Sequence, residues 1–363
     1  MLRLLAAAVL AASAVAASAA DAPPPPAPAL PTTEGDYVAH DFKFTDGETL
    51  KDLRLHYTTL GKPHRDRHGQ VDNAVMVLHG TGGDGHQFIR PIFSGVLFVP
   101  GGVLDANRYF IILPDGIGHG KSSKPSDGLH AKFPHYDYDD MVRAQYLLAT
   151  QGLHVNHLRL VMGTSMGCMH SFVWAETYPD FIDAAMPLAC LPVQIAGRNR
   201  IWRKMIAQGI TNDPAYQGGE YKSEPQMGLR IAIDFLLMAG TTPLVSQKAA
   251  PTRDAADTYL DDFTKREMAS LDANDFLYQI EASRNYDPSA KLGIIKAPVM
   301  WVNSADDFIN PPDLGIAEVQ VKNIPHGTFV LIPTSDKTHG HGTHTWAAVW
   351  QDHLAELLKA SAR

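Results

Sequence analysis

Residues 158–178 read LRLVMGTSMGCMHSFVWAETY, and this stretch decides the fold. Residues 158–162 form a short apolar run typical of a buried strand, and residues 166–178 have the length and composition of a helix. Between them, Gly163-Thr164-Ser165-Met166-Gly167 matches G-x-S-x-G in the strand–turn–helix setting that this pattern requires. The two glycines permit a tight turn that lifts the Ser165 hydroxyl above the sheet. We therefore interpret Ser165 as a nucleophile; the alternative is a purely structural glycine turn.

The rhythm of strand and helix continues on both sides of this stretch. Short apolar runs at 74–78, 109–113 and 299–302 are bounded by Gly, Asp, Asn or Pro and predict further buried strands. Residues 139–150 predict another helix. Strands that alternate with helices predict an α/β fold with a mostly parallel central sheet and helices on both faces.

Residues 191–292 break this rhythm, because they are rich in helix formers and contain no clear strand. They predict a helical lid inserted into a core formed by residues 36–190 and 293–363. A separate domain that folds alone is the alternative. Among Trp202, Met205, Tyr216, Tyr221 and Met227 of the lid, we expect some to supply an apolar acyl or alcohol pocket and others only to pack the lid.

The N-terminus has the features of a cleaved leader. Arg3 precedes an apolar run that ends in small residues at 17–20, which predicts a signal peptide over residues 1–20. The proline-rich residues 21–35 predict an extended tether. The apolar run is shorter than the roughly 20 residues that span a bilayer, although an N-terminal anchor is the alternative. We expect a secreted protein, periplasmic in a Gram-negative bacterium, without a membrane span after cleavage.

Charge and cysteine content narrow the possible partners. The 363 residues carry a net charge of −8, which disfavours nucleic acid and anionic membranes as partners. Cys168 and Cys190 are the only cysteines. An exported protein can pair them, but each lies beside an apolar segment, so we expect two buried free thiols.

A serine nucleophile needs a base and an acid, which follow it in the order Ser, Asp, His in this strand–turn–helix arrangement. Asp307 follows the strand predicted at 299–302 and stands four residues before Pro311, which favours it as the acid over Asp306. His341 follows a glycine after the strand predicted at 328–333, which favours it as the base over His344 and His339.

The remaining polar features fit the same site. Thr81, in the glycine-rich loop at 79–83, and Met166, directly after Ser165, are the expected backbone donors to an oxyanion. The glycine cluster at 115–120 lacks phosphate-loop spacing, so we expect a turn close to the site and no cofactor. Three histidines at 339–344 also suggest a metal site, but no second cluster of Cys, His and carboxylates supports one.

An ordered series of segments resembles the homoserine O-acetyltransferase branch of the α/β-hydrolases over residues 36–358. The segments are DNAV at 72–75, DMVRAQ at 140–145, SMG at 165–167 continuing to Trp174, NDP at 212–214, GL at 228–229, DAN at 272–274 and Asp307 with PP at 311–312. The resemblance implies an α/β-hydrolase fold, an acyl-serine intermediate on Ser165, and Asp307 and His341 as the other triad members. It also implies a lid that mediates a homodimer.

The chain departs from that branch where the resemblance implies amino-acid binding. The substrate-binding arginine and tyrosine of the branch are replaced by Ile233 and Gly240, although Arg230 lies one helical turn from Ile233. We therefore expect an exported serine hydrolase that cleaves an ester. The alternatives are an O-acyltransferase with another alcohol acceptor and a non-catalytic binding protein on the same scaffold.

Overall fold

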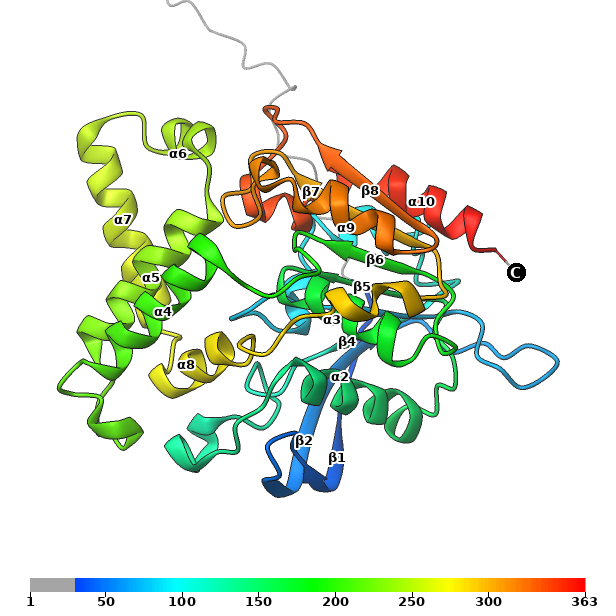
Figure 1. The fold of residues 1–363 in the computed structure, drawn as a ribbon, viewed down its shortest axis with the longest axis horizontal. Helices are drawn as coiled ribbons and strands as arrows, with labels where there is room; N and C mark the ends of the chain where they lie inside the picture. The colour runs from blue at the N-terminus through cyan, green and yellow to red at the C-terminus, as the bar shows by residue number, and fades with distance from the viewer. Residues whose placement is uncertain (1–29, 363) are drawn as a thin grey trace, which may run out of the picture.

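An eight-stranded sheet forms the body of the protein, in a computed structural model that describes residues 30–362 (Figure 1). The strands are β1 (Thr33–Lys43), β2 (Thr49–Leu60), β3 (Ala74–Leu78), β4 (Phe110–Pro114), β5 (Leu160–Thr164), β6 (Ala185–Leu188), β7 (Val299–Ser304) and β8 (Gly327–Ile332). Their order is β1-β2-β4-β3-β5-β6-β7-β8. Strand β2 is antiparallel to both of its neighbours, and all other neighbouring pairs are parallel. The predicted mostly parallel sheet is confirmed.

Three strands were not predicted, and several boundaries differ; the strand predicted at 158–162, for example, is β5 at Leu160–Thr164. The hairpin β1–β2 was not predicted, because its residues alternate between exposed and buried instead of forming an apolar run. The tether predicted to end at residue 35 is too long: β1 begins at Thr33, whose backbone pairs with Thr59. Strand β6 has only four residues, one of them Pro187, and was also missed. The predicted leader and most of the tether lie outside the described residues.

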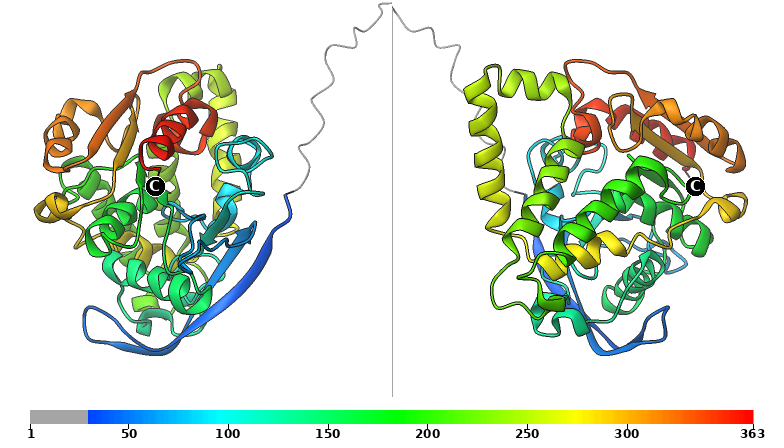
Figure 2. Two further views of the ribbon diagram at one scale, coloured as in Figure 1. Left: turned by 90° about the vertical axis from the view of Figure 1, so that its right-hand side faces the viewer. Right: turned by 60° about the vertical axis from the view of Figure 1, so that its left-hand side comes forward.

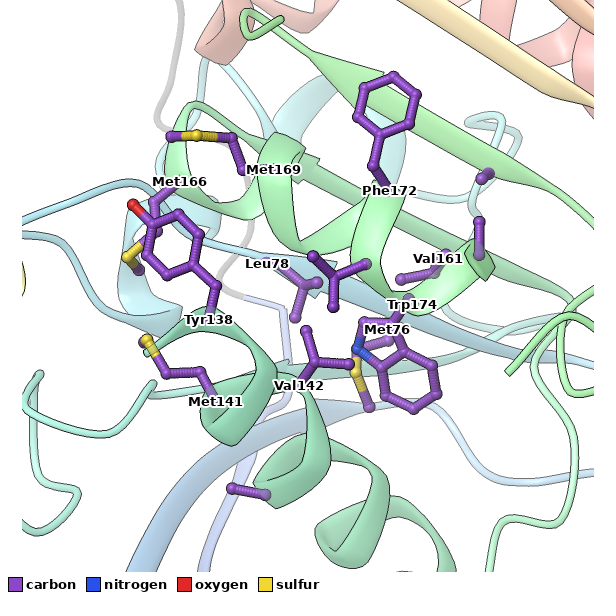
Figure 3. Packing of buried hydrophobic residues seen from close by; sticks show 14 of the residues in the cluster. Met76, Leu78, Tyr138, Met141, Val142, Val161, Met166, Met169, Phe172 and Trp174 are labelled. Atoms are coloured by element: carbon purple, nitrogen blue, oxygen red, sulfur yellow. The ribbon is translucent and has the colours of Figure 1, made fainter. Parts of the chain in front are cut away.

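Helices cover both faces of the sheet, and alternate residues of β3 point into the two layers. On one face, Met76 and Leu78 pack beneath α2 (Tyr138–Leu147) and α3 (Met166–Thr177), as Figure 3 shows. On the other face, Val75 and Val77 belong to a cluster with residues of α1 (Ser94–Leu97) and α10 (Gln351–Ala360). The short helix α9 (Ile316–Gln320) lies between β7 and β8 in the chain. A strand that is apolar on both faces explains why β3 could be predicted residue for residue.

Five helices lie between β6 and β7 in the chain and form a body beside the sheet (Figures 1 and 2). They are α4 (Gly197–Thr211), α5 (Gln226–Gly240), α6 (Pro243–Ala249), α7 (Arg253–Met268) and α8 (Ala273–Glu281). Trp202, Ile206, Leu229 and Phe276 give this insertion an apolar core of its own. Over the described residues, no single helix has the length and apolar character to cross a membrane; only α5 and α6 taken together do, across a bend of 107°.

Candidate active site

The turn between β5 and α3 holds Ser165 in a strained conformation. Its φ of 55° lies in the left-handed region, which non-glycine residues seldom adopt. A Cβ on Gly163 would overlap the backbone of Gly167, and a Cβ on Gly167 would overlap the carbonyl oxygen of Leu78. Only glycine fits at these two positions, so α3 packs directly against the end of β3 and raises Ser165 at the edge of the sheet.

Ser165, His341 and Asp307 form one hydrogen-bonded series. Nε2 of His341 lies 2.8 Å from Oγ of Ser165, and Nδ1 lies 2.9 Å from Oδ2 of Asp307. The Asp307 carboxylate can only accept, so Nδ1 donates and Nε2 is left to accept the serine proton. His341 and Asp307 are almost completely buried.

The carboxylate of Asp307 is fixed by donors from the loop after β7. Its Oδ1 accepts hydrogen bonds from the backbone N–H groups of Ile309 and Asn310, and its Oδ2 accepts one from the Asn310 side chain. Burial alone would raise the pKa of Asp307, but His341 and the Asn310 donors outweigh burial and lower it. The carboxylate is therefore charged and correctly placed to orient the imidazole.

The alternatives to Asp307 and His341 have other contacts. Asp306 accepts from Thr338 Oγ1 at 2.8 Å and from the Gly340 N–H at 3.1 Å, so it anchors the loop that carries His341. The His339 ring stacks on Trp346 at 3.9 Å. His344 packs edge-to-face against His341, and its burial lowers its pKa to about 3. No group of three His, Cys, Asp or Glu side chains within residues 30–362 could hold a metal ion.

The loop after β3 passes close to Ser165. A Cβ on Gly80 would stand 3.4 Å from the Ser165 Cβ. Thr81 lines a cavity together with Ser165 and His341, and Met166 is the first residue of α3. In the described part of the chain, the backbone N–H groups of Thr81 and Met166 have no hydrogen-bond partner. Both remain available to an incoming oxygen atom.

Buried polar side chains hold this loop in place. His79 donates from Nδ1 to the Gly80 carbonyl, and its Nε2 accepts from the N–H of Gly116, in the glycine cluster expected to lie near the site. Gln87 donates to Thr164 Oγ1 at 3.0 Å, which ties the loop to the Ser165 turn. Gln87 was missed by the sequence analysis, since a lone glutamine carries no pattern.

Two cavities share Ser165 and His341 in their walls. The insertion-side cavity, of about 510 Å³, is lined by residues 189–191 and 193–199, by Arg203 and by residues after β7 that include Ile309. The loop-side cavity, of about 460 Å³, is lined by residues 80–84 and by Gln87, Arg90, His344 and Thr345. This arrangement provides one compartment for each half of a substrate whose reacting carbon lies at Ser165.

The apolar pocket expected from the lid residues does not lie at Ser165, although Trp202 and Met205 line a separate cavity of about 460 Å³. None of Trp202, Met205, Tyr216, Tyr221 and Met227 lines either cavity at Ser165. Trp202 and Tyr216 pack in the core of the insertion instead, and Met227 is 72% exposed. Apolar residues in a helix cannot be assigned to its core or to a pocket from spacing alone.

The positions that differ from the homoserine O-acetyltransferase pattern do not line the two cavities either. Ile233 is fully buried and, like Gly240, lines neither cavity. Arg230 does not replace the missing arginine, because its half-exposed side chain points toward Asp261 at 4.0 Å. The cavity wall instead contains Arg203 of α4, which was not singled out from the sequence.

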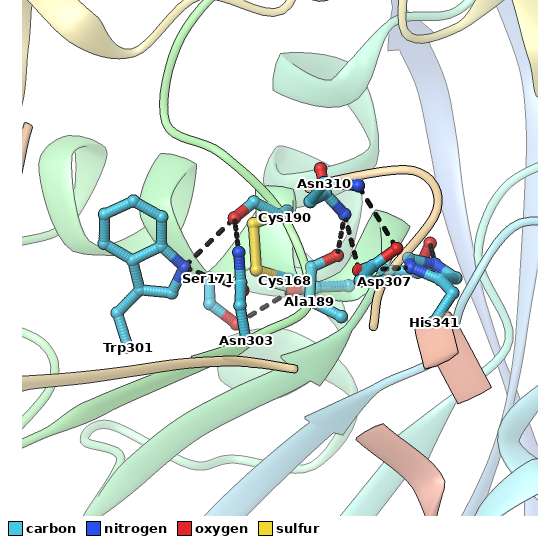
Figure 4. Close-up of a disulfide and its surroundings, with 11 residues drawn as sticks. Cys168, Ser171, Ala189, Cys190, Trp301, Asn303, Asp307, Asn310 and His341 are labelled. Carbon is cyan, nitrogen blue, oxygen red and sulfur yellow. Dashed lines mark hydrogen bonds and ion pairs between the residues drawn. A yellow bond between two sulfur atoms is a disulfide. The ribbon is translucent and has the colours of Figure 1, made fainter. Parts of the chain in front are cut away.

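Cys168 and Cys190 form a disulfide, so the expected free thiols are wrong (Figure 4). Their Cα atoms lie 5.8 Å apart although 22 positions separate them in the chain, a proximity that the fold creates. The bond joins α3, three residues after Ser165, to the segment that leads into the insertion. The Cys190 carbonyl also accepts hydrogen bonds from Trp301 Nε1 and Asn303 Nδ2.

Comparison with known proteins identifies the class. Residues 73–337 match the family model described as the alpha/beta hydrolase fold, so the chain belongs to that family. Over 302 residues it is 30% identical to a probable acyltransferase of Methanothermobacter thermautotrophicus, covering 83% of this chain and 90% of that protein. It is 30% identical over 314 residues to the homoserine O-acetyltransferase of Geotalea daltonii, covering 75% and 82%.

Among solved structures, the acetyl esterase MekB superposes with a TM-score of 0.78 at 26% identity, over 90% of this chain and 97% of that one. The homoserine O-acetyltransferase of Bacillus anthracis superposes with a TM-score of 0.79, and its 20% identity supports the shared fold alone. Within the family, this chain resembles the homoserine O-acetyltransferase branch. It is an α/β-fold enzyme of the esterase-like or acyltransferase type.

Proposed function

We propose that this protein is an exported serine hydrolase that cleaves carboxylic esters through an acyl-serine intermediate. The observation that carries the proposal is the hydrogen-bonded series of Ser165, His341 and Asp307 beside two unpaired backbone N–H groups. Two cavities that meet at Ser165 suit an ester, because its acyl and alcohol parts extend in opposite directions from the reacting carbon.

The chemistry follows from the positions of these atoms. Ser165 Oγ attacks the ester carbonyl while His341 Nε2 takes its proton, and Asp307 stabilises the resulting imidazolium. The backbone N–H groups of Thr81 and Met166 stabilise the oxyanion. When this tetrahedral intermediate collapses, the bond to the alcohol oxygen breaks, and the alcohol leaves with the proton from His341. Water then attacks the acyl-serine by the same route, so that ester and water give acid and alcohol.

Export is supported by two independent features. The first is the leader pattern over residues 1–20. The second is the Cys168–Cys190 disulfide, because disulfides persist mainly in oxidising compartments outside the cytoplasm. Measuring the cleaved N-terminus by mass spectrometry after expression with the native leader tests this part; an intact leader on cell-associated protein would contradict it.

Transfer of the acyl group to an alcohol is the second candidate function. It is favoured by the acyltransferase relatives, and it differs from hydrolysis only in the acceptor that resolves the acyl-serine. The insertion serves as the lid for either function, since its residues 193–199 line the insertion-side cavity. Exposed Met227 and Met238 on the insertion support a homodimer through this body.

A p-nitrophenyl acetate assay with and without competing alcohols separates the functions. Release of p-nitrophenol with free acetate as the product supports the hydrolase, whereas acetylated alcohol as the main product supports the transferase. A Ser165→Ala protein is the control for both. Turnover by neither route would indicate a binding protein and overturn the proposal.

A further inference from the structure

The insertion-side cavity contains a buried cation in a mostly apolar wall. Met169, Leu191, Ile195 and Ile309 contribute apolar side chains, and Arg203 contributes a guanidinium although the residue is only 3% exposed. Charged side chains are seldom buried this completely unless they are paired with an opposite charge. Arg203 is therefore expected to have a partner of opposite charge.

The protein supplies Arg203 with neutral partners only. Nε donates to Asn199 Oδ1 at 2.9 Å, and Nη1 donates to Ser283 Oγ at 3.0 Å. The Tyr138 hydroxyl lies nearby, and burial raises its pKa above the ordinary tyrosine value, so it is uncharged. A guanidinium has five N–H donors, which exceeds the two oxygen atoms that accept from Arg203.

Nearby carboxylates do not neutralise Arg203. Across residues 30–362, no Asp or Glu lies within ion-pair distance of it. Glu281 contributes at longer range but pairs with Arg200 at 3.4 Å. Asp313 and Arg198 also line the cavity, but both are exposed, so neither charge belongs to its buried part. The buried part of the cavity thus carries uncompensated positive charge.

We propose that Arg203 binds a carboxylate carried by the substrate, so that the enzyme acts on esters that bear a free carboxylate. A planar carboxylate matches the fork of a guanidinium and forms two charge-assisted hydrogen bonds with it. The apolar wall accommodates the carbon chain between that carboxylate and the ester at Ser165. The inference rests on the proposed esterase function and specifies its substrate class.

Matched pairs of esters test the inference. Mono-p-nitrophenyl glutarate carries the carboxylate on the acyl part, and p-nitrophenyl pentanoate is its neutral counterpart. The acetate ester of 4-hydroxybutyrate carries it on the alcohol part, with butyl acetate as the counterpart. We expect the wild-type protein to prefer the charged member of one pair in kcat/KM. A preference for the neutral member in both pairs would overturn the inference.

Variants then assign the preference to Arg203. Arg203→Met should lower kcat/KM for the preferred charged ester about 30-fold or more, and change the neutral ester by less than about threefold. Arg203→Lys should retain part of the preference, because it keeps the charge but loses the fork. Lys204→Met, which removes the exposed neighbouring cation on α4 outside the cavity wall, should change neither ester. Equal losses on both esters would show that Arg203 is structural.

A binding measurement keeps the two proposals separable. Calorimetry with Ser165→Ala protein should detect binding of mono-p-nitrophenyl glutarate that is lost on adding Arg203→Met and largely kept on adding Lys204→Met. Failure of the wild type to hydrolyse any of the four esters would reject the esterase function, and the calorimetry would still decide the role of Arg203. Equal binding with and without Arg203 would reject the carboxylate site.

Discussion

The carbonyl oxygen of Leu78, at the end of β3, occupies the space where a side chain on Gly167 would begin. Since backbone atoms of a central strand cannot shift cheaply, Gly167→Ala should lower the free energy of unfolding by about 3 kcal/mol or more. Gly95→Ala is the matched control, because a Cβ there meets only the Pro91 side chain at 3.9 Å. Urea denaturation of the two variants measures the difference. Equal stability would mean that α3 does not pack on β3 in this way.

Ser165 and His341 should act as a unit. Ser165→Ala and His341→Ala should each lower kcat for a p-nitrophenyl ester by about 10⁶-fold, and the double variant should lose little more. A fluorophosphonate probe should label wild-type protein at Ser165 and leave Ser165→Ala unlabelled. Peptide mapping that found the label on another serine would reject the assignment.

Hydrolysis should decline in acid because a protonated His341 cannot accept the Ser165 proton. Asp307 does not cause this decline: its pKa lies below the ordinary carboxyl value, so it stays ionised as the pH falls through the weakly acidic range. His344 does not cause it either, since burial lowers its pKa to about 3 and it stays neutral there. The kcat/KM–pH profile of His344→Asn should therefore keep the acid limb of the wild type. Loss of the acid limb in this variant would identify His344, and not His341, as the general base.

The Cys168–Cys190 disulfide should stabilise the fold. Closing a loop over a separation of 22 residues is worth about 3 kcal/mol in the chain-entropy treatment. The Cys168→Ser, Cys190→Ser double variant should therefore unfold at lower denaturant concentration than the oxidised wild type. Reductant should destabilise the wild type and leave the double variant unchanged; an identical response of both proteins would argue against the bond.

Acetyl-CoA and homoserine should give no useful acetyl-homoserine. Ile233 and Gly240 stand where the homoserine O-acetyltransferase pattern has the arginine and tyrosine that bind the amino acid. Neither residue lines a cavity with Ser165. Arg203 supplies a different carboxylate site and does not restore these two ligands; a missing charge-assisted pair costs about 2 to 5 kcal/mol, or roughly 30-fold to several-thousand-fold in rate. Mass-spectrometric quantification of the product, beside an acetyl ester in water, checks this. Robust acetyl-homoserine formation would favour the transferase over the hydrolase.

The sequence was most informative where a local pattern determines the structure. A five-residue apolar run predicted β3 to the residue, and G-x-S-x-G predicted the turn at Ser165. Asp307 and His341 could be named from chain order, and they lie within hydrogen-bonding distance of one another.

Features that depend on distant packing could not be predicted in this way. Arg203 lies among Arg198, Arg200 and Lys204, and no sequence pattern distinguishes it from these neighbours. Its burial arises because α4 packs against α8 and the segment containing Ser283. The disulfide was missed for the same reason, since spacing along the chain does not reveal which cysteines the sheet brings together.

The separation of the two cavities has a consequence for protein engineering. They share Ser165 and His341, but their remaining walls come from different segments: residues 189–203 and the loop after β7 on one side, residues 80–90 and His344 on the other. Selectivity for the two halves of a substrate is therefore modular. A library randomised at Met169, Leu191 and Ile309 should retune one half and leave the other as it is, so two libraries can be optimised in parallel and recombined.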